Sequence, residues 1–235
     1  MKPIPCILFI MSIILITACS GDRDTSSGGS DNPVNTIKLN SDLMTPEALW
    51  SFGRISGIRI SPDNKKILFR ATFYDVQENG SNGELFIISV EDGKMRNITN
   101  TQVTEFNARW RPDGEKIGYL SSESGTVQLW EINPEGRKRQ QITHIKGGIE
   151  GFEYAPNQKR ILYIKQVKLD NTVHDIHPDL PKAQARIETD LMYRHWDKWH
   201  NYKYSHVFVA DYSSKGVSNS TDIMEGERYH TPLEP

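Results

Sequence analysis

The sequence predicts an all-β protein: a partial β-propeller of about three four-stranded blades from a larger propeller, with a helical insertion in the third blade. Two observations support this. A motif of a turn followed by a strand occurs three times, and a motif of two strands joined by a glycine turn occurs twice. The 235 residues are 37% hydrophobic and 25% charged, with a formal net charge of −2. That balance is ordinary for a globular chain and gives no electrostatic reason to expect nucleic acid as a partner.

The N-terminal segment has the pattern of an export signal. One positive charge, Lys2, precedes an apolar run from Ile4 to Ile16, and small residues follow. The run is too short for a comfortable transmembrane span. The string "ITAC" at 16–19 resembles the lipobox of bacterial lipoproteins, in which the cysteine is acylated. Residues 1–19 are therefore predicted to be a lipoprotein signal peptide with Cys19 as the lipidation site. The alternative is an ordinary secretory signal with an incidental cysteine.

Residues 20–40 are predicted to be a flexible polar tether, since "SGDRDTSSGGSDNP" contains nothing that could pack. The resemblance to lipoproteins implies a chain anchored in the bacterial cell envelope through Cys19. Ser20 stands where an aspartate would favour the inner membrane, so the expected site is the outer membrane, facing the periplasm or the exterior. With Cys6 removed and Cys19 acylated, no disulfide could form.

Three copies of a turn motif begin the repeat, at 59–69 ("RISPDNKKILF"), 109–119 ("RWRPDGEKIGY") and 153–163 ("EYAPNQKRILY"). Proline followed by Asp or Asn favours a tight turn, and the alternating apolar residues after it are typical of a half-buried strand. The strands on either side of each proline are therefore expected to pair.

A second motif repeats at 84–99 ("ELFIISVEDGKMRNIT") and 128–143 ("QLWEINPEGRKRQQIT"). Thr99 and Thr143 are 44 positions apart, and each lies 13 positions before a proline. A period near 44 residues with four short strands is typical of a propeller blade. The blades are expected at about 57–99, 106–143 and 150–212, in a propeller domain over 41–235. Trp110 and Trp130 are expected between adjacent blades.

The third repeat is interrupted by an insertion at about 167–204. Within it, "DLPKAQARIETDLMYRHW" (179–196) places apolar residues at helical spacing, and Pro181 suits a first helical turn. A helix or helix pair is therefore expected. Large insertions often lie on the face that binds a partner; the alternative is that this one packs over the propeller.

Two stretches resemble the prolyl oligopeptidase family of serine peptidases, in its bacterial dipeptidyl peptidase and acylaminoacyl peptidase branch. They are "LMTPEALWSFGRISGIRISPDNKKILF" (43–69) and "DLPKAQARIETDLMYRHWDKW" (179–199) with the following "HVFVADY". The resemblance covers residue 40 to the end. It implies a propeller that caps a C-terminal α/β-hydrolase domain carrying a Ser-Asp-His triad, and that restricts entry to peptides.

The hydrolase signature G-x-S-x-G is absent from the sequence. The nearest string, "GVSNS" (216–220), ends in serine and is expected in a polar loop. No catalytic residue is therefore predicted, nor any cofactor. His195, His200 and His206 with Asp197 lack the i, i+4 spacing of a helical metal site, so no metal site is predicted either.

The resemblance also implies propeller acids that hold the free amine of a substrate. Glu188 and Asp190 lie in the right insertion and are the candidate substrate-binding residues. The alternative for both is surface solvation or a helix salt bridge, such as Arg186 with Asp190.

Two functions of different classes are expected. The first is the N-terminal propeller part of a lipid-anchored serine exopeptidase, which gates and binds oligopeptides while a catalytic domain outside this chain performs the hydrolysis. The second is a non-catalytic envelope propeller, similar to TolB-type proteins, that binds partner proteins. Three blades cannot close a ring, so the chain is expected to be part of a longer protein and marginally stable alone.

Overall fold

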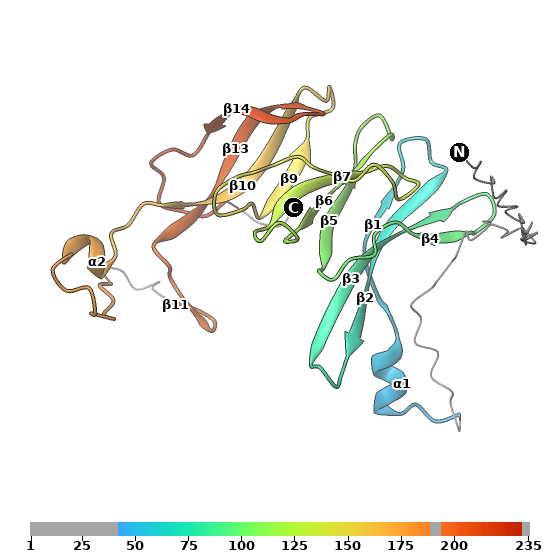
Figure 1. The fold of residues 1–235 in the computed structure, drawn as a ribbon, viewed down its shortest axis with the longest axis horizontal. Coiled ribbons are helices and arrows are strands. Elements are labelled where there is room, and N and C mark those ends of the chain that lie inside the picture. The colour runs from blue at the N-terminus through green and yellow to red at the C-terminus, as the bar shows by residue number, and fades with distance from the viewer. Residues whose placement is uncertain (1–41, 189–193, 232–235) are drawn as a thin grey trace, which may run out of the picture.

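A computed structural model describes residues 42–188 and 194–231 of the chain. Three antiparallel four-stranded sheets stand in a row (Figure 1), which confirms the prediction of a partial propeller. Blade 1 consists of β1 (Arg54–Ile60), β2 (Lys66–Asp75), β3 (Gly80–Ser89) and β4 (Met95–Asn97). Blade 2 consists of β5 (Glu105–Trp110), β6 (Ile117–Ser121), β7 (Gln128–Ile132) and β8 (Gln140–Gln141). Blade 3 consists of β9 (Gly151–Tyr154), β10 (Arg160–Lys168), β13 (Lys203–Ser213) and β14 (Gly216–Asp222).

The strands of blades 1 and 2 pair in chain order from the inside of the row to the outside. The first strands of neighbouring blades, β1 with β5 and β5 with β9, contact each other. These first strands therefore line the inner side of the row, as the innermost strands of propeller blades do. A short helix, α1 (Pro46–Ser51), precedes blade 1 and packs on β2. No helix in the described part of the chain is long and apolar enough to cross a membrane.

The three proline turns have the same geometry. In each, the residue two after the proline has a positive φ: 59° at Asn64, 74° at Gly114 and 55° at Gln158. The Asp or Asn that directly follows the proline accepts a hydrogen bond from a backbone N–H two residues later, at 3.0–3.1 Å. Asn, Gly and Gln are residues without a β-branch, which lowers the cost of the left-handed conformation. The predicted pairing around each proline is confirmed, since β1 pairs with β2, β5 with β6 and β9 with β10.

A repeated threonine closes the outer side of blades 1 and 2. Thr99 Oγ1 accepts from the N–H of Leu85 at 2.9 Å and donates to Glu84 at 2.7 Å. In blade 2, Thr143 Oγ1 accepts from the N–H of Leu129 at 2.8 Å and donates to Gln128 at 2.7 Å. The constant spacing in the sequence thus reflects one hydrogen-bond network formed twice, with Glu84 and Gln128 in equivalent positions.

The apolar core lies between the blades. Leu68, Leu85 and Ile87 of blade 1 pack against Ile117 and Tyr119 of blade 2, and all five are nearly or fully buried. A second cluster joins blades 2 and 3 through residues such as Leu120, Leu129, Ile161 and Tyr163. Each blade therefore depends on its neighbour for burial, which is the reason that propeller blades are not independent units.

The two tryptophans predicted between blades pack against the core of blades 1 and 2. Trp110 also donates from Nε1 to the carbonyl of Arg59 in blade 1, at 3.3 Å. The Trp130 ring lies under the guanidinium of Arg139, 4.8 Å from the ring centroid.

The third blade extends further than the sequence motifs indicated. Strand β14 pairs with β13, so Gly216–Ser220 lies on the outermost strand of the blade and not in a polar loop. The expected end of the blade at 212 was therefore wrong, because the insertion shifts the last strand away from the 44-residue spacing. His206 of blade 3 pairs across the sheet with Lys165, as Gln128 does with Ser121 and Glu84 with Ala71. A histidine thus takes the position held by Glu and Gln in the first two blades.

Candidate functional site

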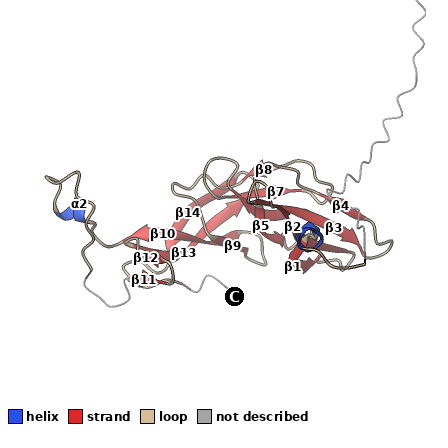
Figure 2. Cartoon of the chain, turned by 90° about the horizontal axis from the view of Figure 1, so that it is seen from below, coloured by secondary structure: helices blue, strands red, loops and turns tan. Residues whose placement is uncertain are grey.

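The insertion connects β10 to β13 through residues 169–202. Helix α2 (Val173–Ile176) lies beyond the end of the blade in both Figure 1 and Figure 2. Thr172 caps it: the Thr172 hydroxyl accepts from the N–H of Asp175 at 3.3 Å, and the Asp175 carboxylate accepts from the N–H of Thr172 at 2.7 Å. This reciprocal capping box fixes the first turn of a helix too short to persist alone. The described part of the insertion around α2 therefore projects away from the blades (Figure 1).

The helix expected over 179–196 is absent from its described residues. The chain at 181–188 has no regular secondary structure. Two of the apolar residues that suggested the helix, Leu180 and Ile187, are 50% and 39% exposed. An amphipathic helix needs a surface on which to bury its apolar stripe, and this part of the insertion provides none. Leu191 and Met192, which completed the predicted stripe, lie outside the described residues.

Instead of a helix, the insertion ends in a two-stranded hairpin, β11 (Arg194–His195) with β12 (Lys198–Trp199). Trp196 lies in its two-residue turn with φ 54° and is 90% exposed. The ring of Trp199 has two guanidinium groups near it, Arg186 at 5.5 Å and Arg194 at 5.3 Å from the centroid. A large aromatic side chain held almost wholly in solvent marks a potential contact surface. The alternation of aromatic and charged residues around "WD" was the sequence signal for this hairpin, and the helical pattern concealed it.

The predicted substrate-binding acids are only partly described. Glu188 lies in the insertion, 4.0 Å from the guanidinium of Arg186. Arg186 in turn donates to the carbonyl of His200 at 2.7 Å. Glu188 thus faces a cation that the protein fixes in place. Asp190 lies outside the described residues, so the role of both acids in binding a substrate amine, and the alternative salt bridge of Arg186 with Asp190, stay predictions. Cys19 also lies outside the described residues.

A polar cluster lies where the insertion leaves and rejoins blade 3. Asp170 accepts from the hydroxyl of Tyr204 at 2.7 Å and forms an ion pair with Arg228. His200 Nε2 lies 3.6 Å from the same carboxylate. Burial alone would raise the pKa of Asp170, but the hydrogen bond from Tyr204 and the charge of Arg228 lower it below its usual value. A lasting negative charge at Asp170 therefore ties together the start of the insertion, its end and the segment after β14.

The histidines considered as metal ligands have separate partners. His206 is fully buried in blade 3 and contacts Asp222, whereas His200 lies near Asp170. Among the residues that the structure describes, no three His, Cys, Asp or Glu side chains converge as a metal site would require.

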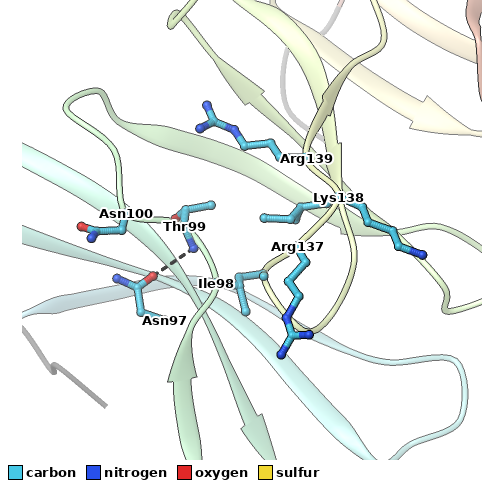
Figure 3. Close-up of a pocket in the computed structure, with 9 residues that line it drawn as sticks. Asn97, Ile98, Thr99, Asn100, Arg137, Lys138 and Arg139 are labelled. Atoms are coloured by element: carbon cyan, nitrogen blue, oxygen red, sulfur yellow. Dashed lines mark hydrogen bonds between the residues drawn. The ribbon is translucent and has the colours of Figure 1, made fainter. Parts of the chain in front are cut away.

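A pocket of about 310 Å³ lies between blades 1 and 2 (Figure 3). Its walls come from the segment after β4 and from the turn between β7 and β8, and three consecutive basic residues, Arg137, Lys138 and Arg139, lie along one of them. Their side chains diverge: Arg137 and Lys138 point away from the opposite wall that carries Asn97 and Asn100. Arg139 is engaged elsewhere, donating to the Tyr119 hydroxyl at 2.8 Å and pairing with Glu123. Because these charges do not converge, the pocket is not an anion site as it stands.

Relatives with known names exist among curated proteins and solved structures. The chain is 34% identical over 210 residues to "Dipeptidyl-peptidase 5" of Porphyromonas endodontalis, which is 89% of this chain and 30% of the relative. It is 39% identical over 192 residues to "Dipeptidyl-peptidase 5" of Porphyromonas gingivalis, which is 82% of this chain and 28% of the relative. The chain thus spans less than a third of the length of the relatives that it matches. No protein-family model matches it.

Among solved structures, the acylaminoacyl peptidase of Pyrococcus horikoshii superposes with a TM-score of 0.57 at 16% identity, over 74% of this chain and 26% of that protein. At this identity the likeness concerns the fold alone. It agrees with the row of four-stranded blades seen in Figure 1.

Proposed function

This chain belongs to the prolyl oligopeptidase family of serine peptidases, as a β-propeller portion, and from that premise we propose that it gates and helps to bind oligopeptides for an exopeptidase. The observation that carries the proposal is the similarity to two dipeptidyl peptidases over 82–89% of the chain. A match of 210 residues in a chain of 235 necessarily includes the third-blade insertion. Hydrolysis itself requires a nucleophile elbow that this sequence does not contain.

The insertion supplies the proposed substrate contacts. It projects beyond blade 3 and carries an exposed aromatic residue, Trp196, and the acid Glu188. We assign Glu188 and Asp190 to the free amine of the peptide, because a carboxylate pairs favourably with a cationic chain end. The neighbouring Arg186 keeps Glu188 in place until the amine arrives. Contact of the peptide with the insertion would select for chain ends and so favour exopeptidase action.

Replacing Glu188 by glutamine in the protein with its catalytic portion tests this assignment. We expect kcat/KM for peptides with a free N-terminus to fall about tenfold, since one charge-assisted hydrogen bond is lost. Peptides with an acetylated N-terminus should be affected much less. The control is Glu135→Gln, an exposed acid in the β7–β8 turn of blade 2. Equal losses for free and blocked peptides would contradict the amine assignment.

We further propose that Cys19 is lipidated and that the protein is anchored in the cell envelope, at the outer membrane. The support is the lipobox-like "ITAC" and the polar tether after it. Several acyl chains on one cysteine give stable anchoring, which a single chain does not. Cys19→Ser should move the protein from the membrane fraction to the soluble fraction, as measured by immunoblotting of fractionated cells, whereas Cys6→Ser should not. Membrane retention of the Cys19 variant would contradict the anchor.

The second candidate is a non-catalytic propeller that binds partner proteins in the envelope. The absence of G-x-S-x-G from these 235 residues favours it, and the exposed Trp196 hairpin would offer a contact surface. Under this reading the Glu188 variant would leave peptide turnover in the cell envelope unchanged.

A further inference from the structure

Strand β13 holds the segment that follows blade 3. Residues 223–231, here named the latch segment, contact the strand through backbone hydrogen bonds and through two histidine side chains. The N–H of Ile223 donates to the carbonyl of Val207 at 3.1 Å, and the N–H of Thr231 donates to the carbonyl of Ser205 at 2.8 Å. The remaining contacts are made by two histidines, His206 on the strand and His230 in the segment. The latch segment is thus fixed at both ends by backbone bonds and between them by imidazole rings.

The ring of His206 has an acceptor at each nitrogen. Nδ1 lies 2.8 Å from the carboxylate of Asp222, and Nε2 lies 2.8 Å from the carbonyl oxygen of Glu227. A carbonyl oxygen and an ionised carboxylate can only accept, so both ring nitrogens must carry hydrogen for both bonds to form. Since His206 is fully buried, water cannot replace a missing bond. The bond that reaches the latch segment is the one from Nε2 to Glu227, so this nitrogen must carry hydrogen.

The ring of His230 has the opposite requirement. Its Nδ1 lies 3.1 Å from the backbone nitrogen of Ser205, whose N–H can only donate. Nδ1 must then present a lone pair, which leaves the single proton of a neutral ring on Nε2. The Ser205 hydroxyl, 3.3 Å from the same Nδ1, can donate or accept and adds no second constraint. The Ser205 N–H is therefore bonded only while the His230 ring is neutral.

We propose that His230 forms a pH-sensitive latch, which holds residues 223–231 against β13 only while its ring is neutral. Acid breaks the His230 arm, because a proton on Nδ1 would face the N–H of Ser205. The latch segment is therefore released on the acid side.

The other charged groups around the two rings agree with this arrangement. His230 faces Tyr204 and His200, with ring centroids 5.4 and 6.3 Å away, and the Glu150 carboxylate is also near. Burial lowers the pKa of His230, and the neighbouring His200 lowers it further, against the opposing charge of Glu150. On the other ring, His206 faces Asp222 and its cross-strand neighbour Lys165.

Acid favours release of the latch segment, because a base whose pKa is lower in the latched form binds more protons when released. The His230 arm therefore contributes its full stability above the ordinary histidine pKa, and the contribution is lost as the pH falls through and below that value. Arg228 lies in the latch segment and pairs with Asp170 at the root of the insertion. Release of the latch segment at low pH would break this ion pair, so the proposed substrate-binding insertion would lose one of its contacts with the segment after β14.

The direct test is the protonation state of the His230 ring in the full chain, read from nitrogen chemical shifts after labelling of the histidines. Near neutral pH we expect a single proton on Nε2 of His230. A protonated Nδ1 on His230 would overturn the proposal. This measurement uses the unaltered protein, so it does not depend on whether a variant folds.

Amide hydrogen exchange tests the consequence. Lowering the pH from about 7 to about 5, across the range in which histidine titrates, should speed exchange of the Thr231 amide about tenfold relative to the Leu129 amide of blade 2, after correction for intrinsic rates. In His230→Gln the acid effect should vanish, because the glutamine oxygen accepts from Ser205 without titrating. The control His144→Gln alters an exposed histidine after blade 2 and should keep the acid effect. Persistence of the effect in His230→Gln would also overturn the latch.

Discussion

Buried ionisable side chains mark the contacts between blades. Glu131 of blade 2 is 1% exposed and accepts from the hydroxyls of Tyr154 and Tyr212 in blade 3, the first at 2.7 Å. Burial raises the pKa of both tyrosines, and so does the adjacent Glu131 carboxylate. The guanidinium of Arg111 lies 3.8 Å from Glu131 and offsets its charge. Tyrosines that cannot ionise remain donors, which keeps the carboxylate satisfied in the interface.

Glu105 is the least satisfied of these buried groups. Its side chain is fully buried at the start of blade 2, and Thr101 donates to Oε1 at 2.5 Å while Oε2 has no hydrogen bond in the described structure. Burial raises the pKa of Glu105 to about 7, and the nearby Glu84 carboxylate adds to the effect although Thr101 opposes it. Between the ordinary carboxyl pKa and about 7, the folded protein therefore retains a proton that the unfolded chain releases.

We therefore expect Glu105→Gln to raise the free energy of unfolding, by an amount that depends on pH. A raised carboxyl pKa means that stability is full below the ordinary pKa and is lost as the pH rises toward about 7. The glutamine variant should therefore be more stable than the parent by about 2 kcal/mol above neutral pH, and little different at pH near 4. Urea unfolding at both pH values measures this. Destabilisation by the variant above neutral pH would show that the charged form is favoured.

At the scale of the elements, the repeated threonines connect strands that are far apart in the sequence. Thr143 links the start of β7 to the segment after β8, and Gln128 also accepts from the N–H of Ile145 at 3.1 Å. Thr143 is 1% exposed, so a lost bond cannot be replaced by water.

Thr143→Val should therefore destabilise the protein by about 1–3 kcal/mol, because valine keeps the shape but leaves the N–H of Leu129 and the oxygen of Gln128 unpaired. Thr221→Val, on an exposed position of β14, should change stability by less than about 0.5 kcal/mol. Chemical unfolding of the two variants side by side provides the comparison. Equal effects would mean that the repeated network contributes nothing of its own.

The sequence predicted well those elements whose conformation is determined by residues next to each other in the sequence. Each proline turn is fixed by its own Pro, Asp or Asn and left-handed residue, so three local patterns sufficed. The prediction of a helix over 179–196 was wrong for its described residues, because helical spacing alone does not provide a surface on which to pack. Strand β14 was missed because its polar residues, such as Ser218 and Asn219, point to solvent at the edge of the sheet and show no alternating pattern.

At the scale of the whole molecule, the three blades form a row in which each depends on its neighbour. The clusters on either side of blade 2 contain most of the buried apolar residues described. The candidate site lies at the far end of this row, in the insertion of blade 3 (Figure 1). The sequence indicated the insertion as a candidate site and named Glu188 and Asp190, and their role stays a prediction. It did not indicate the hairpin with Trp196 or the cluster around Asp170, because those groups are brought together by tertiary contacts.

We propose that this propeller serves a serine peptidase whose nucleophile lies outside these 235 residues. The most direct test is a fluorophosphonate probe applied to cell envelopes, followed by capture with an antibody raised against blades 1 and 2. We expect the captured material to contain a labelled serine hydrolase, and the purified 235-residue chain alone to remain unlabelled. Captured material without any labelled hydrolase, or labelling of the isolated chain, would contradict it.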